Sequence, residues 1–438
     1  MSYSSDTIYA LSSGSLPAGV AVIRISGNKA FEASRILVGA EPPRPRKASL
    51  RTIRGRNGDA IDQALVLHFQ APHSFTGEDC VELQVHGSRA VVAAIFDILE
   101  SQTDFRHAEA GEFSKRAFDN GKMDLLEVEG LADLLKAETE MQRRLAVEQS
   151  SGKLSNLYDG WAHQLTRCRA LIEAELDFAD EEDVPDSVAD QVWVKVAQLE
   201  QDLSAHIESG TGSEIIRDGF RVALVGAPNV GKSSLMNALS GRDVAIVTDI
   251  AGTTRDVLSV DLDVDGYLVT LFDTAGIRDT SDIVEKEGIR RASLTAETAN
   301  LVLHLSDTDS YPEQIWESQA TLRLHTKADN IGVTSLNGDL SVSVVTEEGL
   351  HELKHLIKIA IEQQVGGAAS LMPGRGRHKK RLEETLNYVR EALASEGMEL
   401  AIRSEYLRLA ATSLGRITGR VDVEDLLGVI FSEFCIGK

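Results

Sequence analysis

The residue types best suited to chemistry gather in one glycine-rich segment, residues 226–234 (GAPNVGKSS). It follows an apolar run at residues 220–225 (FRVALV) and precedes a stretch typical of a helix. In such a loop, backbone N–H groups turn inward onto phosphates, Lys232 reaches the β- and γ-phosphates, and the Ser233 hydroxyl binds Mg²⁺. The alternative, a glycine turn with a helix-capping serine, fits the strand–loop–helix order less well. The nucleotide-binding residues predicted here are Asn229, Val230, Gly231, Lys232, Ser233 and Ser234.

Two downstream segments indicate which nucleotide would bind. Residues 273–276 (DTAG) end a β-type run, so Asp273 is expected to hold Mg²⁺ through water, with the Gly276 N–H facing the γ-phosphate. In residues 326–329 (TKAD), the Asp329 carboxylate can accept two hydrogen bonds from guanine, a pair that adenine does not offer. The pattern therefore predicts GTP. The residues concerned, with the last base-contacting loop, are Asp273, Thr274, Ala275, Gly276, Thr326, Lys327, Ala328, Asp329, Ser343, Val344 and Val345.

Three positions depart from the usual guanine-nucleotide motifs. Thr326 replaces an asparagine and keeps a hydroxyl but no carboxamide, so a modest fall in affinity is expected. Val344 replaces an alanine and keeps its backbone N–H for the base. Ile277 stands where many signalling GTPases place a glutamine that orients the attacking water. Because isoleucine cannot polarise water, hydrolysis is either very slow or uses another group.

The elements that must position these residues divide the chain into several domains, of class α/β and α. Strands and helices alternate over residues 220–365, which predicts a parallel sheet wrapped by helices, a Ras-like P-loop fold. Residues 123–180 and 187–208, and the chain after residue 381, have helical spacing. We therefore expect an N-terminal α+β domain at 1–120, a discontinuous helical domain at 121–215 with 366–438, and an inserted G domain at 216–365.

Composition restricts the class of protein. A length of 438 residues favours two or three domains, and a net charge of −23 disfavours broad binding to nucleic acid. The basic run at 375–381 could contact phosphate, but a solvated helix start explains it equally well. The acidic run at 177–186 fits solvated helix ends better than a metal cluster. Three scattered cysteines, no signal peptide and no long apolar run predict a cytoplasmic protein without a membrane span.

Several motifs outside the phosphate loop carry a resemblance to one family. They are residues 22–27 (VIRISG), 74–84 (SFTGEDCVELQ), 111–118 (GEFSKRAF), 248–256 (TDIAGTTRD), 424–428 (EDLLG) and 434–438 (FCIGK). Together they resemble the MnmE, or TrmE, tRNA-modification GTPases of the TrmE-Era-EngA type, over nearly the whole chain.

The resemblance implies how GTP would be hydrolysed. In that family a potassium ion takes the place of an arginine finger and neutralises transition-state charge. The implied K⁺ ligands are Asn229, Thr248, Ile250 and Thr253. The implied Mg²⁺ ligands are Ser233 and Thr254. The implied catalytic residues are Glu285, Lys232 and Thr254. The implied GTP-binding switch residues are Thr248, Asp249, Ile250, Ala251, Gly252, Thr253 and Thr254. By itself Glu285 reads as an exposed carboxylate, and Arg255 and Arg278 are alternative arginine fingers.

The resemblance also implies a folate site in the N-terminal domain. Arg24, Glu82, Lys122 and Lys438 match the positions that contact a tetrahydrofolate derivative, in its 5-formyl or 5,10-methylene form. A carboxylate can pair with the amino-pyrimidine edge of a pterin, and cations suit a formyl oxygen or a glutamate tail. Taken singly, each residue reads as a surface charge.

The implied activity is modification of the wobble uridine of tRNA at C5, by carboxymethylaminomethyl or aminomethyl addition with a tetrahydrofolate one-carbon unit. The implied assembly is a homodimer that joins a flavin-dependent partner, MnmG (GidA), in a heterotetrameric or larger complex. No Gly-x-Gly-x-x-Gly follows a strand, so we expect no flavin on this chain itself. Two alternatives are a ribosome-assembly GTPase switch and a folate-binding protein with a regulatory GTPase.

Overall fold

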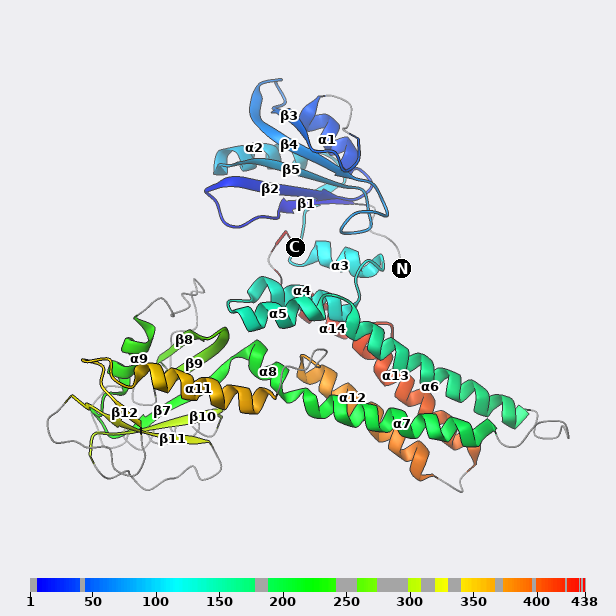
Figure 1. Ribbon diagram of the computed structural model, residues 1–438. Helices are drawn as coiled ribbons and strands as arrows, with labels where there is room; N and C mark the ends of the chain where they lie inside the picture. The colour runs from blue at the N-terminus through cyan, green and yellow to red at the C-terminus, as the bar shows by residue number, and fades with distance from the viewer. Residues whose placement is uncertain are drawn as a thin grey trace, which may run out of the picture. The chain divides into compact units, whose positions relative to one another are not determined.

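The computed structural model describes residues 6–39, 44–177, 188–241, 258–273, 298–308, 320–329, 340–366, 373–395, 399–421, 424–432, 434 and 436–437. The chain divides into two compact units (Figure 1). Unit 1 comprises Met1–Ala132 and Gly415–Lys438, and unit 2 comprises Asp133–Leu414. The finer boundaries at residues 120, 215 and 365 stay a prediction. No helix in the described ranges is long and apolar enough to cross a membrane.

Unit 1 contains a six-stranded sheet in the order β3-β4-β5-β2-β1-β6. Its pairs are antiparallel, except that β1 and β6 run parallel. The strands are β1 (Thr7–Leu11), β2 (Ala18–Ser26), β3 (Ser49–Arg54), β4 (Ala60–Phe69), β5 (Cys80–Gly87) and β6 (Phe105–His107). The expected mixture of strands and helices is therefore present in this part of the chain.

The two faces of this sheet differ because side chains alternate along each strand. On β2, Ile23 and Ile25 are buried and pack with α1 (Ala30–Val38) and α2 (Arg89–Glu100) in one core. Arg24 lies between them in sequence and points to the opposite face, as does Glu82 on β5. This second face, called here the open face, is only partly buried and carries the charged side chains.

The last residues of the chain return to unit 1. The helix α14 (Glu424–Ser432) shares a hydrophobic cluster with the first part of α4 (Leu125–Lys136), to which Phe431 and Phe434 contribute. Beyond it, Ile436 forms a β-bridge with Ala110, and the Ser12 hydroxyl donates to the Gly437 carbonyl at 2.7 Å. Ala110 lies two residues before α3 (Glu112–Asp119), and Gly437 packs against Leu11 of β1.

Unit 2 contains the second sheet, in the order β12-β11-β10-β7-β9-β8. All its pairs are parallel except β8 with β9. The elements are β7 (Phe220–Gly226), α9 (Lys232–Ser240), β8 (Leu258–Val264), β9 (Tyr267–Asp273), β10 (Leu301–Ser306), β11 (Thr321–Thr326), β12 (Leu340–Val342) and α11 (Leu350–Val365). The central strands β7 and β10 are largely buried. The parallel sheet predicted from the strand–helix alternation is present, except that the edge strand β8 runs antiparallel to β9.

Among the described residues, unit 2 has further helices, with α6 against α7 and α7 against α12. These helices are α5 (Glu140–Gln149), α6 (Lys153–Asp177), α7 (Val188–Ser209), α8 (Thr211–Asp218), α12 (Gly376–Ala394) and α13 (Leu400–Thr418), whose last residues lie in unit 1. The continuous helical spacing of residues 123–180 is divided into three helices. The second begins at a capping box formed by Thr139 and Gln142, and the third follows the left-handed Gly152.

Candidate functional site

The phosphate loop has the backbone shape that its sequence predicts. It joins the end of β7 to α9, and Gly231 caps the helix with φ of 106°. A Cβ on Gly226 would overlap the Leu305 carbonyl oxygen, and φ at this residue is 155°, so only glycine fits there. Asn229 has a left-handed backbone, with φ of 62°. The loop therefore leads into a helix N-terminus, where backbone N–H groups favour an anion.

Two polar side chains of the loop are held in place by hydrogen bonds. Buried Lys232 donates from Nζ to the carbonyl oxygens of Gly226 (2.7 Å) and Ala227 (2.8 Å). Burial lowers the pKa of Lys232, and the nearby Asp273 carboxylate partly opposes this. The Ser233 hydroxyl donates to Asp273 Oδ2 at 2.7 Å. Two of the three predicted Mg²⁺ residues are thus in contact, and an oxygen pair of this kind suits a hard cation.

The base-binding segments meet at the carboxyl ends of β11 and β12. The Ser343 hydroxyl donates to Asp329 Oδ1 at 2.6 Å, which orients the carboxylate expected to accept from guanine. Ser343 is itself held by a hydrogen bond from its N–H to the Glu348 carbonyl (3.0 Å). Val344 and Val345 follow it and are exposed, by 38% and 74%. The structure therefore brings the two predicted base-contacting segments together.

Thr326 connects the base-binding end to the phosphate loop. Its buried hydroxyl donates to the Val230 carbonyl at 2.7 Å and lies 3.2 Å from the Ser306 carbonyl. The neighbouring Lys327 forms an ion pair with Asp307 at 2.6 Å. Sequence reasoning missed Ser306 and Asp307. Their signal was their place at the end of the apolar run 301–305, because ligands bind beyond the carboxyl ends of parallel strands.

The contact between Thr326 and the phosphate loop leads to a first prediction. Replacing Thr326 by the nearly isosteric valine leaves the buried Val230 carbonyl without its donor, so affinity for both GTP and GDP is expected to fall roughly tenfold. Titration with a fluorescent guanine nucleotide measures it. The matched control, Thr326→Ser, keeps the hydroxyl and should bind within about threefold of the unaltered chain. Equal affinity of the valine variant would mean that the hydroxyl has no role in binding.

Some predicted site residues lie outside the described residues. They are Thr248, Asp249, Ile250, Ala251, Gly252, Thr253, Thr254, Thr274, Ala275, Gly276, Glu285 and Lys438, with Arg255, Ile277 and Arg278. The roles given to them stay predictions.

Two of the predicted folate residues form a pair on the open face of unit 1. Arg24 and Glu82 lie opposite each other on β2 and β5, and both Nε and Nη2 of Arg24 are 3.0 Å from Glu82 Oε1. The guanidinium carbon also lies 4.9 Å from the ring centre of Phe75 and 5.6 Å from that of Phe113. The two side chains remain 15% and 21% exposed, so the pair is held in place yet accessible.

The other two predicted folate residues are linked to the same region by the chain. Lys122 follows α3, and its aliphatic stem lies 3.1–3.2 Å from the position that a Cβ of Gly77 would occupy. Gly77 is two residues from Phe75, over which Arg24 lies. Lys438 is outside the described residues, but Gly437 packs on Leu11, which pairs with Ile23 beside Arg24.

Comparison with known proteins identifies the family to which this chain is related. A family model for the MnmE helical domain matches residues 125–435, and one for the GTP-binding protein TrmE N-terminus matches residues 7–122. The chain is 69% identical to the tRNA modification GTPase MnmE of Agrobacterium fabrum over 99% of both chains. It is 56% identical to that of Rhizobium johnstonii over 100% of both, and 50% identical to that of Brucella ovis over 99% of this chain and 98% of the relative.

Among solved structures, the G domain of the T. maritima FeoB iron transporter matches 34% of this chain and 99% of its own, at 31% identity and a TM-score of 0.24. This score is low, and the fold described above rests on the strand order itself. The two family models and the identity over the full length decide the relationship. The chain belongs to the MnmE family of tRNA modification GTPases.

Proposed function

We propose that this chain hydrolyses GTP as one component of a tRNA-modifying enzyme. The modification proposed is carboxymethylaminomethyl or aminomethyl addition at C5 of the wobble uridine, with a one-carbon unit from tetrahydrofolate. The observation that supports the proposal is that one chain holds two groups of side chains suited to these two ligands. One is the phosphate loop with the oriented Asp329, and the other is the Arg24–Glu82 pair on the open face of unit 1.

The residues of the second site fit a folate. Glu82 offers a carboxylate to an amino-pyrimidine edge, and its exposure of 21% leaves it accessible. The partly buried Phe75 adds aromatic surface beside the Arg24 guanidinium, and such a surface favours a flat heteroaromatic ligand. Phe113 is fully buried and supports the guanidinium from within the core. The proposed assembly is a homodimer formed through the N-terminal domain, in the cytoplasm, with the flavin supplied by an MnmG (GidA) partner.

The proposed roles in hydrolysis combine described and undescribed residues. Ser233 and Asp273 fit a Mg²⁺ ion, which would neutralise phosphate charge when bound. Lys232 reaches the same phosphates, and Thr254 and Glu285 are proposed to complete the site. Asn229 is the potassium ligand proposed on the phosphate loop. Its backbone is left-handed, and its exposed side chain is free to reach a cation.

The potassium assignment gives a second prediction. Hydrolysis is expected to be roughly tenfold or more faster in K⁺ than in Na⁺ at the same ionic strength, because a cation of the right size neutralises transition-state charge as an arginine finger does. Phosphate release in matched chloride salts measures it. In an Asn229→Ala variant, the difference between the salts should shrink. Equal rates in the two salts for the unaltered chain would remove potassium from the mechanism.

Analysis of modified nucleosides tests the proposed function as a whole. In tRNA from a strain lacking this chain, the C5-modified wobble uridine should be absent, and it should return when the unaltered chain is expressed. The matched control is Lys232→Ala, which disturbs the phosphate loop while leaving unit 1 intact, and should not restore the modification. Normal tRNA together with defective ribosomal particles would favour the alternative, a ribosome-assembly GTPase switch. The net charge of −23 argues against that alternative.

A further inference from the structure

The loop between β4 and β5 is closed by short hydrogen bonds. Within residues 74–79, called here the 74–79 loop, the Ser74 hydroxyl donates to the Glu78 carbonyl (2.5 Å), and the Glu78 N–H donates to Thr76 Oγ1 (3.2 Å). Ser26, at the end of β2, holds the loop from one side. Its hydroxyl donates to Glu78 Oε2 and lies 2.7 Å from Thr76 Oγ1. This side of the loop is therefore tied to the strand that carries Arg24.

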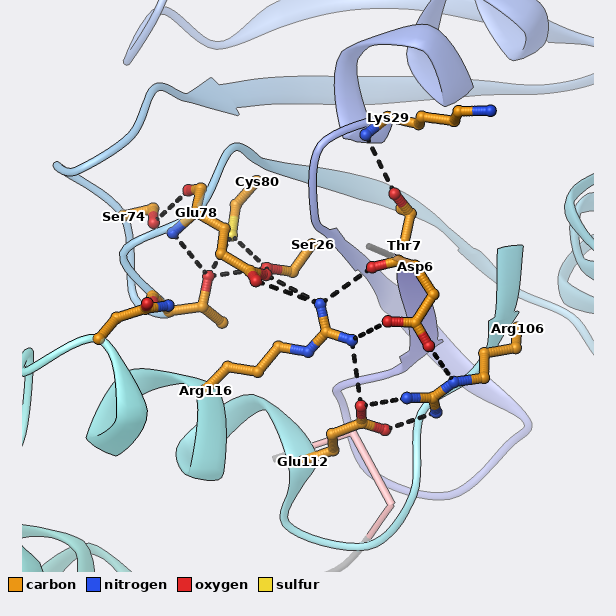
Figure 2. A network of polar contacts seen from close by, with 12 residues as sticks. Asp6, Thr7, Ser26, Lys29, Ser74, Glu78, Cys80, Arg106, Glu112 and Arg116 are labelled. Carbon is orange, nitrogen blue, oxygen red and sulfur yellow. Dashed lines mark hydrogen bonds and ion pairs between the residues drawn. The ribbon is translucent and has the colours of Figure 1, made fainter. Parts of the chain in front are cut away.

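Arg116 of α3 holds the loop from the other side. Its Nη1 lies 3.2 Å and 3.1 Å from the two carboxylate oxygens of Glu78 and 3.1 Å from the Asp6 carbonyl. Its Nη2 lies 3.0 Å from Asp6 Oδ1 and 3.1 Å from Glu112 Oε1. Figure 2 shows the guanidinium between these three carboxylates. With 8% of the side chain exposed, Arg116 is the most enclosed charge of the cluster.

The electrostatics of the cluster favour the charged forms of Glu112 and Arg116. Burial raises the pKa of Glu112, but hydrogen bonds from Arg106 and from the Glu109 N–H, with the charges of Arg116 and Arg106, lower it below its usual value. Burial also lowers the pKa of Arg116, and the Glu78 and Glu112 carboxylates more than offset this. Removing one partner from such a buried set leaves an uncompensated charge. Arg116 is therefore the charge that balances the Glu78 carboxylate, which the Ser26 hydroxyl also contacts.

The 74–79 loop contacts two of the four predicted folate residues and leads into a third. Phe75 lies under the Arg24 guanidinium, Gly77 packs against the stem of Lys122, and Glu82 follows the loop on β5. Asn120, which is also close to Gly77, donates to the Thr76 carbonyl at 2.7 Å. A displacement of the loop would thus move the aromatic support of Arg24 and the neighbour of Lys122 together.

We propose that Arg116 is a positioning residue of the folate site, acting through Glu78 and the 74–79 loop. This rests on the folate binding proposed above. Arg116 holds the loop against α3 and Asp6, while Ser26 ties it to β2. The residues Arg24, Glu82 and Lys122 thereby keep one arrangement toward the ligand. Lysine cannot replace it, because an ammonium lacks the planar fork that reaches Glu78, Asp6 and Glu112 together.

Arg106 provides a matched control within the same cluster. It pairs with Asp6 and Glu112, and it also donates to the His107 carbonyl. Its Nη1–Glu112 distance of 2.8 Å is comparable to the contacts of Arg116, and it shares two carboxylates with that residue. A substitution of Arg106 therefore disturbs the same charges without removing the bond to the loop.

The experiment measures the affinity of the full chain for 5-formyltetrahydrofolate by calorimetry, with the melting temperature and GTP affinity of each variant. Arg116→Lys is expected to weaken folate binding roughly tenfold or more, whereas Arg106→Lys should stay within about twofold. Glu78→Gln should weaken binding as Arg116→Lys does. The double variant with both Arg116→Lys and Glu78→Gln should bind folate no more weakly than the weaker-binding of the two single variants, because both changes break the same contact. GTP affinity should be unchanged in all of them.

The outcomes separate this inference from the function on which it rests. Failure of the unaltered chain to bind 5-formyltetrahydrofolate would overturn the proposed folate function itself. If the unaltered chain binds and Arg116→Lys binds equally well, the positioning role is wrong. If the Arg116 and Arg106 variants lose folate affinity equally, and the losses follow the fall in their melting temperatures, the cluster has only a structural role.

Discussion

Replacing Asp329 by asparagine is expected to move the nucleotide preference of this chain from GTP to xanthosine triphosphate. The carboxylate accepts from both the N1–H and the exocyclic amine of guanine, whereas an amide presents one acceptor and one donor. Xanthine has a carbonyl in place of that amine and so matches the amide. The amide cannot accept both hydrogen bonds from guanine, and a site loses much of its affinity for a ligand whose hydrogen bonds it cannot satisfy. GTP affinity should therefore fall by on the order of 10²–10⁴-fold.

The contact between Ser343 and Asp329 supplies a control for this switch. The Ser343 hydroxyl lies 2.6 Å from Asp329 Oδ1 and can either donate or accept, so it can hold the asparagine amide as well. Ser343→Ala should instead weaken GTP and xanthosine triphosphate alike, without changing the preference. Competition titrations with both nucleotides measure the ratio. A variant Asp329→Asn that binds GTP unchanged would place the base site elsewhere.

The nucleotide site could be predicted from the sequence because its parts are local. The phosphate loop, Asp273 and the segment 326–329 each occupy a few consecutive residues at the carboxyl end of a strand, and strand–helix alternation fixes which ends meet. The role of Thr326 could not be read in the same way. Its hydroxyl reaches the Val230 carbonyl, 96 positions earlier in the chain, and only the packed sheet brings them together.

The charged cluster of unit 1 was not predicted for a related reason. Arg116 reads as one more charge on an amphipathic helix, and its partners Asp6 and Glu78 are 110 and 38 positions away. Spacing on a helix can indicate the contact between Arg116 and Glu112, which are four residues apart, but not the other two. The helix boundaries near residues 139 and 152 were missed because caps, rather than apolar spacing, set them.

The return of the chain end to unit 1 was inferred from the resemblance alone, and its contacts are now defined. Lys438 was assigned to the folate site with Arg24, Glu82 and Lys122. The bridge between Ile436 and Ala110 and the bond from Ser12 to the Gly437 carbonyl, 425 positions apart, place the residues before it beside β1. Within one chain, therefore, the segment after α14 reaches the sheet that carries Arg24.

Deleting residues 434–438 is expected to abolish folate binding and tRNA modification while leaving GTP binding intact. The deletion removes Lys438, the bond to Ser12 and the bridge to Ala110, all in unit 1. It also removes Phe434, which is 5% exposed and packs with Phe431, so unit 1 should lose roughly 3 kcal/mol or more of stability. The phosphate loop and the base-binding segments lie in unit 2 and retain their own core.

Two measurements on the same truncated protein decide this last prediction, namely calorimetry with 5-formyltetrahydrofolate and titration with a guanine nucleotide. Because the truncation also disturbs packing, Lys438→Ala is the matched variant: it keeps Phe434 and the Gly437 bond, and removes only a charge. It should weaken folate binding by roughly tenfold or more without lowering the melting temperature, since a charge-assisted hydrogen bond contributes on the order of 1.5–3 kcal/mol. Unchanged folate affinity would remove Lys438 from the site. Loss of GTP binding in the truncated protein would mean that the tail is required for folding, because a defect confined to the folate site cannot reach residues held in a separate core.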